Sequence, residues 1–479
     1  MKNKFYITTS IAYVNASPHL GYALELIQAD VISRYQRTFK KDVFFLTGTD
    51  EHGEKIFKKA KEIGKEPQEF VDEMSFQFKK LTESLNISND DFIRTTDKKR
   101  HIPTVKKVWL KLKENGDIYK KKYKGFYCVG CEKFLLKKDL INGKCPYHLE
   151  KPEIIEEENY FLKLSKYQKK IKKIIEDEKI KIIPEKRKNE ILSFLNEGLD
   201  DISVSRPKEK VSWGIPVPND ESQTIYVWVD ALINYISAIG YNKNLSKFKK
   251  YWPADVHCIG KDIYRFHAII WPIMLLSLKL PCPKNIFIHG FITSKGQKMS
   301  KSLGNIINPF DLIEKYGADP VRYFLLREIP PTEDGDFTYE KFEKRYNSDL
   351  SSGLGNLVSR VVSMEEKFGI KKSDNKIIQK EIKKIKKEYH KLMKEFKFNT
   401  ALESIWELIK FSDKYIDKEK PWENKKRAPL IIGDLIIILN EINNLIYPFL
   451  PETYERIKKQ IKTKKSEILF PKTIKNFLK

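Results

Sequence analysis

The sequence predicts an α/β fold in which a doubly wound, Rossmann-like parallel sheet is interrupted by an insertion and followed by an all-α domain. Three observations support this. Nearly continuous apolar strands alternate with helices over 1–114 and again over 225–290, a mixed segment with clustered cysteines lies between them, and long helical periods fill 347–479. Strands that are apolar throughout are typical of parallel sheets covered on both faces. The length of 479 residues allows two to four domains.

The first half of the predicted sheet occupies residues 1–114. We expect strands at 5–9 and 43–46, a helix from about 19 to 38, and helices that begin near 54 and 69. Ligands of doubly wound sheets bind at the carboxyl ends of the strands. Asp50, which closely follows the second strand, is therefore a candidate binding residue.

The insertion, residues 115–224, contains a candidate metal site. Cys128 and Cys131 form one pair, and Cys145 and His148 follow thirteen residues later. Three thiolates and one imidazole suit tetrahedral Zn²⁺, and four protein ligands leave no open position for water. The sequence therefore predicts a zinc knuckle with one structural Zn²⁺ per chain.

The alternating pattern resumes after the insertion, over residues 225–290. We expect strands at 224–229, 256–259 and 286–288, with helices at 231–237 and 263–278 between them. Residues 291–346 are predicted to hold a loop and a linker, the linker at 316–320. Residues 347–479 then read as a helical bundle.

Composition and charge indicate the expected cellular location and the class of binding partner. The 90 basic and 65 acidic residues give a net charge of +25, which favours a polyanionic partner, although an AT-rich genome would also enrich lysine. The N-terminus has no apolar signal core, and the longest apolar stretches are too short to cross a bilayer. The chain has five cysteines, an odd number, and three of them are clustered. This favours a reducing compartment, so we expect a cytoplasmic protein with no membrane contact. Cys258 and Cys282 are expected in the core.

Two segments carry residue types that bind phosphate. Residues 17–22 read Ser-Pro-His-Leu-Gly-Tyr and open a helix, so His19 and Gly21 lie where backbone amides and the helix dipole favour an anion. Residues 296–302 read Gly-Gln-Lys-Met-Ser-Lys-Ser, a loop with two cations, Lys298 and Lys301, and no acidic residue. Taken alone, each segment is weak evidence, because such loops on basic proteins are usually solvated surface.

Together the two segments resemble the two signature motifs of class I aminoacyl-tRNA synthetases. Further segments are similar to those of the methionyl-tRNA synthetase family of bacterial type, in the family's order. They are residues 47–53 (TGTDEHG), 226–231 (YVWVDA), 260–263 (GKDI), 289–291 (HGF), 356–360 (NLVSR) and 421–422 (PW). The resemblance covers nearly the whole chain, and its specificity lies in the ordered set.

The resemblance implies a ligase that activates L-methionine with ATP and Mg²⁺, releases pyrophosphate, and transfers methionine to the 3′-terminal adenosine of initiator and elongator tRNA(Met). It assigns catalysis to His19, Tyr22, Lys298 and Lys301, and ATP binding to His19, Gly21, Gly260, Asp262, Lys298 and Lys301. It assigns methionine binding to Ile11, Tyr13, Asp50, Trp228, Ala231, Tyr235, Ile263 and His289. Anticodon binding falls to Asn356, Arg360 and Trp422. Relatives with an appended dimerising module are longer, so a monomer is expected.

Several alternatives remain. At position 22 the family has a second histidine, and a phenol there can donate a hydrogen bond but cannot carry positive charge near neutral pH, or it can simply pack. Apart from the family, the spacing of Trp228 and Tyr235 also suits a helix core. Another class I synthetase, a catalytically silent tRNA-binding relative and a small-molecule adenylyltransferase are the competing functions.

Overall fold

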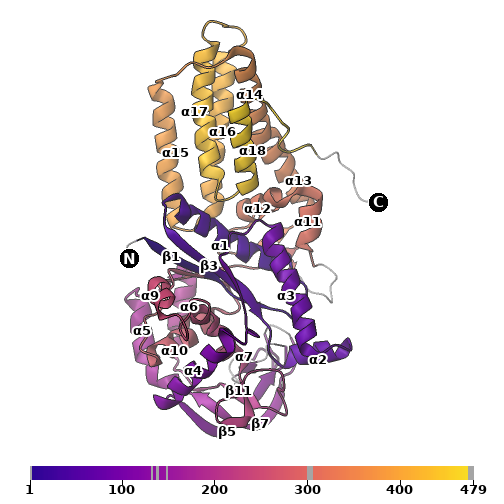
Figure 1. Ribbon diagram of the computed structural model, residues 1–479, viewed down its shortest axis with the longest axis vertical. Helices are drawn as coiled ribbons and strands as arrows, with labels where there is room; N and C mark the ends of the chain where they lie inside the picture. The colour runs from indigo at the N-terminus through magenta and orange to yellow at the C-terminus, as the bar shows by residue number, and fades with distance from the viewer. Residues whose placement is uncertain (1–2, 131–132, 136–139, 147–148, 299–305, 473–479) are drawn as a thin grey trace. The chain divides into compact units, whose positions relative to one another are not determined.

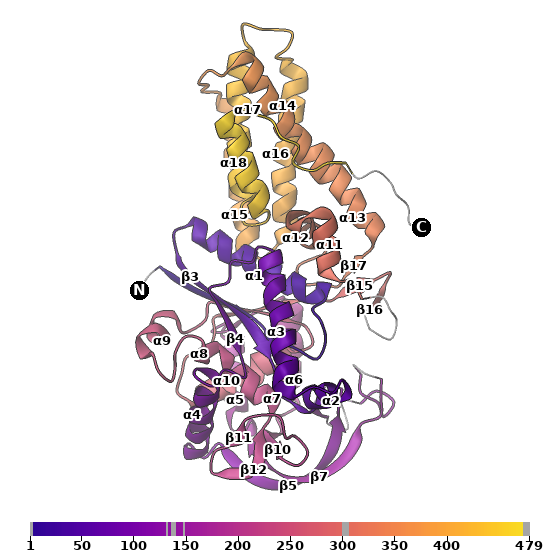
Figure 2. The ribbon, with the colours of Figure 1, turned by 45° about the vertical axis from the view of Figure 1, so that its right-hand side comes forward.

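The computed structural model describes residues 3–130, 133–135, 140–146, 149–298 and 306–472, and its ribbon is shown in Figures 1 and 2. The chain divides into two compact units, which are described separately below. Unit 1 comprises Met1–Pro18, Lys40–Thr82 and Asn89–Ile288, and unit 2 comprises His19–Phe39, Glu83–Ser88 and His289–Lys479.

Unit 1 contains most of the strands. They are β1 (Lys4–Thr9), β2 (Ala12–Tyr13), β3 (Asp42–Asp50), β4 (Asp91–Arg94), β5 (Ile118–Cys128), β6 (Lys133–Leu135), β7 (Glu153–Leu162), β8 (Lys181–Ile183), β9 (Ile202–Ser203), β10 (Ser205–Pro207), β11 (Pro216–Val217), β12 (Asp220–Ile225), β13 (Val256–Gly260) and β14 (Asn285–His289). Its helices are α2 (Glu54–Glu62), α3 (Pro67–Ser84), α4 (His101–Glu114), α5 (Gln168–Glu176), α6 (Glu185–Asn196), α7 (Val227–Leu232), α8 (Asn234–Ser237), α9 (Leu245–Tyr251) and α10 (Trp271–Ser277), with a 3-10 turn at Ser165–Tyr167 and a π-helical segment at Phe266–Ile270.

The main sheet of unit 1 confirms the predicted doubly wound arrangement. Its strand order is β2-β3-β1-β13-β14-β8, and β4 also pairs with β3. β1 runs parallel to both neighbours, with Phe5 opposite Val43 and Ile7 opposite Val256. Every residue of β1 after Lys4 is buried, as expected for a central strand covered on both faces. The carboxyl ends of β1, β3 and β13 therefore lie at one edge of the sheet.

The predicted strand at 224–229 is partly wrong. β12 ends at Ile225, and α7 begins at Val227, where the amides of Val229 and Asp230 both donate to the Tyr226 carbonyl. The β-branched valines resemble a strand in sequence, but here they lie in a helix whose residues are nearly all buried. Burial on all sides removes the polar face that marks an amphipathic helix.

Four strands of the segment 115–224 form a curved antiparallel sheet of order β6-β5-β7-β9, of which β5 and β7 are the long strands in Figure 2, and a second sheet has the order β10-β12-β11. Lys122 lies opposite Glu158 and Lys124 opposite Glu156, so the lysines of β5 face the glutamates of β7. One strand of this segment, β8, lies instead at the edge of the main sheet, with Ile182 opposite Ile286.

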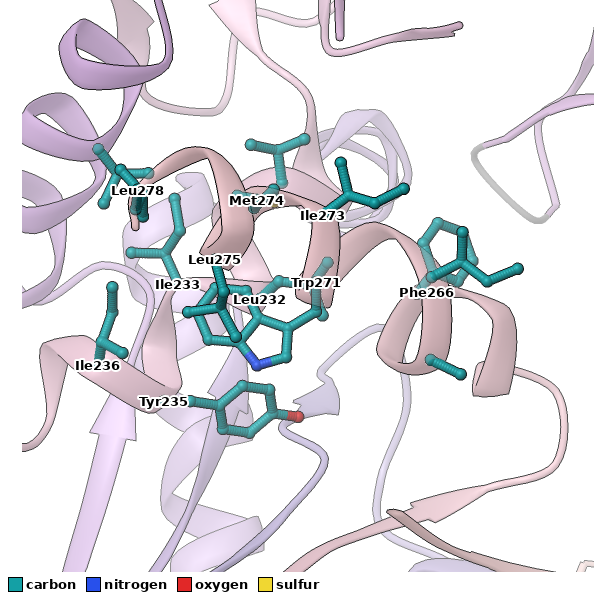
Figure 3. Close-up of a cluster of buried hydrophobic side chains, with 14 of the residues drawn as sticks. Leu232, Ile233, Tyr235, Ile236, Phe266, Trp271, Ile273, Met274, Leu275 and Leu278 are labelled. Carbon is teal, nitrogen blue, oxygen red and sulfur yellow. The ribbon is translucent and has the colours of Figure 1, made fainter. Parts of the chain in front are cut away.

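An apolar core fills unit 1 on the side of α7, α8 and α10. Figure 3 shows the rings of Tyr235 and Trp271 packed together with aliphatic side chains of these helices. The two rings are 5.9 Å apart between centroids, and both residues are at most 1% exposed. The helix that carries Trp271 was predicted at 263–278, and the structure has the π-helical segment followed by α10 there.

Unit 2 is mainly helical, as predicted for residues 347–479. Its helices are α1 (Leu20–Thr38), α11 (Pro309–Tyr316), α12 (Ala318–Arg327), α13 (Tyr339–Arg345), α14 (Asn356–Phe368), α15 (Lys376–Lys394), α16 (Phe398–Glu419), α17 (Ala428–Ile446) and α18 (Pro451–Thr463), with a π-helical segment at Tyr346–Gly355. Its strands are β15 (Ile292–Ser294), β16 (Gln297–Lys298) and β17 (Gly335–Phe337). Figures 1 and 2 both show α14 to α18 side by side as a bundle.

The predicted linker at 316–320 is wrong, because two helices pass through it. α11 ends at Tyr316 and α12 begins at Ala318, separated only by Gly317, whose φ of +87° breaks the helix. Pro320 lies in the first turn of α12, where proline needs no amide partner. Asp319 is buried and accepts the amide of Thr453 at 2.6 Å, which ties α12 to the start of α18.

Helix α17 is long and apolar enough to span a membrane by length and composition alone. In the structure it lies inside the bundle, and thirteen of its residues are buried. Asp434 in its middle accepts from the Tyr415 hydroxyl at 2.6 Å and from the Asn375 amide at 3.0 Å. We therefore describe α17 as the core helix of unit 2.

Candidate active site

The carboxyl end of β3 carries the first predicted methionine-binding residues. Asp50 is the last residue of β3, is 6% exposed, and lies opposite Tyr13 of β2 in parallel register. The Val14 amide donates to the Asp50 carbonyl at 3.2 Å, which fixes the short β2 segment beside it. Ile11 and Tyr13 are half-buried and pack against the apolar core of unit 1.

Helices α7 and α8 carry three more of these residues. Trp228 is half-buried, whereas Ala231 and Tyr235 are buried. The Trp228 ring stacks on Phe266 with centroids 4.0 Å apart and planes 14° apart. Phe266 opens the π-helical segment just after the half-buried Ile263. Sequence reasoning missed Phe266, because its partner lies 38 positions earlier in the chain.

A hydrogen bond from Tyr235 identifies a further residue that the sequence did not single out. The Tyr235 hydroxyl is 2.7 Å from Nε2 of His267, and Nδ1 of His267 is 3.0 Å from the Ile263 carbonyl. A carbonyl only accepts, so Nδ1 carries the ring proton, and in the neutral ring Nε2 accepts from Tyr235. This arrangement fixes the orientation of both side chains.

Behind Tyr235 lies a neutral histidine. The His257 ring is 4.3 Å from the Tyr235 ring, its Nε2 accepts from Nε1 of Trp271 at 3.3 Å, and its Nδ1 is 2.7 Å from Oγ1 of Thr8. Burial and the nearby His267 hold the pKa of His257 well below its ordinary value. This wall of the candidate pocket is therefore aromatic and uncharged.

The predicted ATP-binding residues of unit 1 follow β13. Gly260, its last residue, is buried, and Asp262 is exposed two positions later. Both follow the carboxyl end of a central strand, which is the position expected of a nucleotide contact in this fold.

In unit 2, His19 caps α1. Its Nδ1 accepts the amide of Gly21 at 3.0 Å, and its carbonyl accepts the amide of Tyr22 at 3.0 Å. The Leu20 amide donates to the Ile307 carbonyl at 3.3 Å. We expected these first amides to be available to phosphate, but in the structure each of them already has a partner. Because Nδ1 accepts, the neutral His19 ring carries its proton on Nε2.

One turn further along α1, Glu25 contacts the predicted site residue His289. Oε2 of Glu25 is 2.8 Å from Nε2 of His289, and Nδ1 of His289 is 2.7 Å from the Gly290 carbonyl. All three residues belong to unit 2. The carbonyl can only accept, so Nδ1 of His289 donates to it, and Nε2 is the atom that faces the Glu25 carboxyl. Tyr22, three residues before Glu25, is 9% exposed.

Only part of the cationic loop lies within the described residues. β15 and β16 form a hairpin in which Thr293 is opposite Lys298. Lys295 and Gly296 at its turn both have positive φ, 53° and 74°, as a type I′ turn requires. The Gly296 amide donates to Oδ1 of Asp336 at 2.7 Å. Lys301 lies outside the described residues.

The predicted anticodon residues also belong to unit 2. Asn356 opens α14 and is exposed, and Arg360 follows one turn later. The Arg360 guanidinium is 3.4 Å from Asp413 and 3.3 Å from Asp417 on α16. Trp422, just after α16, is 47% exposed.

Two of the four predicted zinc ligands lie within the described residues. Cys128, at the end of β5, and Cys145 are buried in one small cluster with Leu135. Cys131 and His148 lie outside the described residues. Over the part of the chain that the structure describes, no three histidine, cysteine, aspartate or glutamate side chains form a group able to hold a metal ion.

Comparisons with known proteins agree with this arrangement. A family model described as "tRNA synthetases class I (M)" matches residues 5–151 and 136–362, and one described as "Anticodon-binding domain of tRNA ligase" matches 375–477. The chain is 45% identical over 475 residues to the methionine–tRNA ligase of Thermotoga maritima, covering 96% of this chain and 75% of that protein. It is 46% identical over 477 residues to that of Clostridium acetobutylicum, covering 96% and 73%.

Solved structures give the same result. The Mycobacterium tuberculosis methionyl-tRNA synthetase in complex with methionyl-adenylate is similar with a TM-score of 0.91 at 36% identity, covering 99% of both chains. The likeness therefore extends over the full fold rather than over one motif.

Proposed function

The chain belongs to the methionyl-tRNA synthetases of class I, and we infer that it is a methionine–tRNA ligase that uses ATP. The observation that carries this is the 45% identity to a methionine–tRNA ligase over 96% of the chain. Methionine and ATP give methionyl-adenylate, and tRNA then receives the methionine at its 3′-terminal adenosine. The following assignments of residues to these steps are proposals that rest on this family membership.

Unit 1 provides the methionine site. Tyr13, Trp228 and Tyr235, with the smaller Ile11, Ala231 and Ile263, form an aromatic and aliphatic slot for the uncharged thioether. The neutral state of His257 behind Tyr235 supports this assignment, because a charged wall would disfavour an apolar side chain. Asp50 at the end of β3 receives the α-ammonium group.

The assignments of ATP binding and catalysis follow from the family membership. Gly260 and Asp262 are assigned to the nucleotide after β13, and the side chains of His19 and Tyr22 to the phosphates at the start of α1. Gly21, also assigned to ATP binding, supports this end of α1 through its amide, which donates to Nδ1 of His19. Lys298 and Lys301 neutralise the leaving pyrophosphate, and the magnesium that accompanies ATP adds positive charge there when it is bound. His289 is assigned to methionine binding, and its contact with Glu25 on α1 holds its ring in place.

The reaction needs no covalent enzyme intermediate. A methionine carboxylate oxygen attacks the α-phosphorus, the bond from this phosphorus to the bridging oxygen breaks, and pyrophosphate leaves. His19 can donate from Nε2 to the charged phosphate oxygens. In the second step, the 2′-hydroxyl of the terminal adenosine attacks the adenylate carbonyl and releases its proton. The bond from the carbonyl carbon to the phosphate oxygen breaks, and AMP leaves with its electrons.

The helical bundle reads the tRNA. We assign the anticodon to Asn356, Arg360 and Trp422, because single-stranded bases are recognised by stacking and by hydrogen bonds to their edges. The 47% exposure of Trp422 supports stacking over packing. Initiator and elongator tRNA(Met) share this anticodon and are both proposed substrates.

A structural zinc ion belongs to the proposal as well. Cys128 and Cys145 fit it, because both thiols lie in one buried cluster although they are seventeen positions apart. Together with Cys131 and His148 they would hold Zn²⁺ in a closed site, where the ion stabilises the fold of the insertion and takes no part in the reaction. The domain boundaries given above, a cytoplasmic location and a monomeric state complete the proposal.

Aminoacylation tests the function. Purified protein is incubated with ATP, magnesium, radiolabelled methionine and tRNA(Met), with tRNA of another specificity as the control. We expect acid-precipitable label only with tRNA(Met), and none with a tRNA whose CAU anticodon is changed. Equal charging of both tRNAs would contradict the anticodon assignment, and no charging at all would contradict the function.

A further inference from the structure

A buried carboxylate between two histidines lies beside the candidate methionine pocket. One oxygen of Asp230, in α7, is 2.7 Å from Nδ1 of His52, and the other is 2.8 Å from Nε2 of His101. The exposed fractions of Asp230, His52 and His101 are 1%, 5% and 0%. All three belong to unit 1, and the reaction described above uses none of them.

The cluster joins the segments that carry the pocket. His52 follows Asp50 by two residues, and Asp230 lies between Trp228 and Ala231 on α7. His101 is the first residue of α4. Two carboxylate oxygens therefore connect three segments, two of which carry predicted methionine-binding residues.

His101 makes a second contact, two residues beyond Tyr235. Its Nδ1 is 3.1 Å from Oγ of Ser237 in α8, and that hydroxyl donates to the Ile233 carbonyl at 2.9 Å. The tautomer of His101 decides whether Nδ1 or the Ser237 hydroxyl donates in this contact. His101 thus holds α7 through Asp230 and α8 through Ser237, on either side of Tyr235.

The contact between His101 and Asp230 also contains a proton. Burial opposes ionisation of Asp230, but His52 and His101 outweigh burial and keep the pKa of this carboxyl below its ordinary value. An ionised carboxylate only accepts, so the proton of this contact lies on Nε2 of His101. Hydrogen bonds to an ionised carboxylate are about twice as strong as neutral ones.

We propose that His52, Asp230 and His101 are positioning residues for methionine, which hold α7 and α8 at a fixed place relative to the end of β3. Through these contacts, the walls formed by Trp228 and Tyr235 keep their distance from the Asp50 carboxylate. The inference rests on the proposed function, because it assigns the methionine pocket to these segments.

Backbone contacts near the two histidines do not depend on their side chains. The Gly53 amide donates to the Trp213 carbonyl at 3.0 Å, and Nε1 of Trp213 donates to the Glu51 carbonyl at 2.6 Å, one residue on each side of His52. The His101 amide donates to the Asp97 carbonyl at 3.1 Å. Replacing either imidazole therefore leaves the segment around His52 and the start of α4 anchored. The contacts that are lost are those that hold α7 and α8.

The test compares His101→Leu with His101→Gln in methionine-dependent ATP–pyrophosphate exchange. Glutamine can place its amide near the position of Nε2 and donate to Asp230, whereas leucine fills similar space and cannot donate. We expect His101→Leu to raise the KM for methionine about ten- to a hundredfold, the effect of losing one charge-assisted hydrogen bond, while the KM for ATP stays near the wild-type value. His101→Gln recovers most of the loss.

Thr104→Val is the matched control, because Thr104 is 1% exposed on the same helix and its hydroxyl donates to the Arg100 carbonyl at 2.7 Å, away from Asp230. It should leave both KM values unchanged. If His101→Leu does not fold, His52→Asn and His52→Leu give the same comparison, since the asparagine amide can take the position of Nδ1.

Provided that the wild-type enzyme shows methionine-dependent exchange, two results would overturn the inference. One is an unchanged KM for methionine in the leucine variants, or an equal rise in both KM values. The other is a glutamine or asparagine variant as impaired as the leucine variant, which indicates a packing role only. An inactive wild-type enzyme would instead overturn the proposed function, and with it this inference.

Discussion

Replacing Arg322 should destabilise unit 2 more than replacing any half-exposed arginine of the same unit. Arg322 is fully buried, and its Nη2 is 2.7 Å from Oδ2 of Asp30 on α1. It also donates to three backbone carbonyls, those of Phe449 at 2.7 Å, Pro448 at 3.0 Å and Leu85 at 3.1 Å. One guanidinium thus joins α12, α1, the 83–88 segment and the turn after α17.

The magnitude follows from what remains after Arg322→Leu. Breaking a buried ion pair by removing one partner costs about 3–5 kcal/mol, because a buried charge is left behind. Asp30 keeps Nε of Arg34 at 2.7 Å and the amide of Ser88 at 2.8 Å, so its charge is still compensated. We therefore expect a loss at the lower end, about 3 kcal/mol in the free energy of unfolding.

Denaturant unfolding monitored by circular dichroism measures this loss. The control is Arg345→Leu, because the Arg345 side chain is 30% exposed and pairs with Glu328 and Asp349 near the surface. Such pairs contribute about 1 kcal/mol or less. A loss for Arg322→Leu no larger than that of the control would refute the reasoning.

Three further changes give equally definite expectations. His257→Asn should flatten the pH dependence of stability. In the wild type the folded His257 ring stays neutral while the unfolded ring gains a proton, so the free energy of unfolding falls by about 1 kcal/mol between pH 6.5 and 5.5. If thermal melts show the same dependence on pH for both proteins, this explanation is wrong. Cys145→Ser should reduce zinc from one ion per chain, measured by mass spectrometry, and lower the melting temperature, whereas Cys282→Ser should retain the metal; equal zinc content would refute the site. Trp422→Ala should raise the KM for tRNA about tenfold or more through lost stacking, while ATP–pyrophosphate exchange stays unchanged. If the variant and the wild type charge tRNA with the same kinetics, Trp422 does not stack on the anticodon.

Apolar patterns predicted the main sheet because its strands are buried on both faces. β1, β3, β13 and β14 each carry consecutive apolar residues, and the structure has strands there. The same signal misled at Val227 and Val229, because a helix buried on all sides has no polar face to reveal its period. At 316–320, glycine and proline were interpreted as a break in structure, but Pro320 occupies a helix start that tolerates it.

The site was predicted where a motif is local and missed where it depends on distant partners. The ordered segments made His19, Asp50 and Trp228 candidates from their neighbouring residues alone, and these roles stay predictions. Glu25 is 264 positions from His289, and His101 is 129 positions from Asp230, so no local pattern links them. Only the folded chain shows that these side chains meet.

ATP–pyrophosphate exchange with methionine, leucine, isoleucine, valine and cysteine offered separately tests the central claim most directly. We predict exchange that depends on methionine and is lost in Lys301→Ala. Such exchange would also show that Tyr22 in place of a second histidine does not disable the enzyme. Exchange with a different amino acid would contradict the methionine pocket. No exchange with any of the five would contradict the assignment as a ligase.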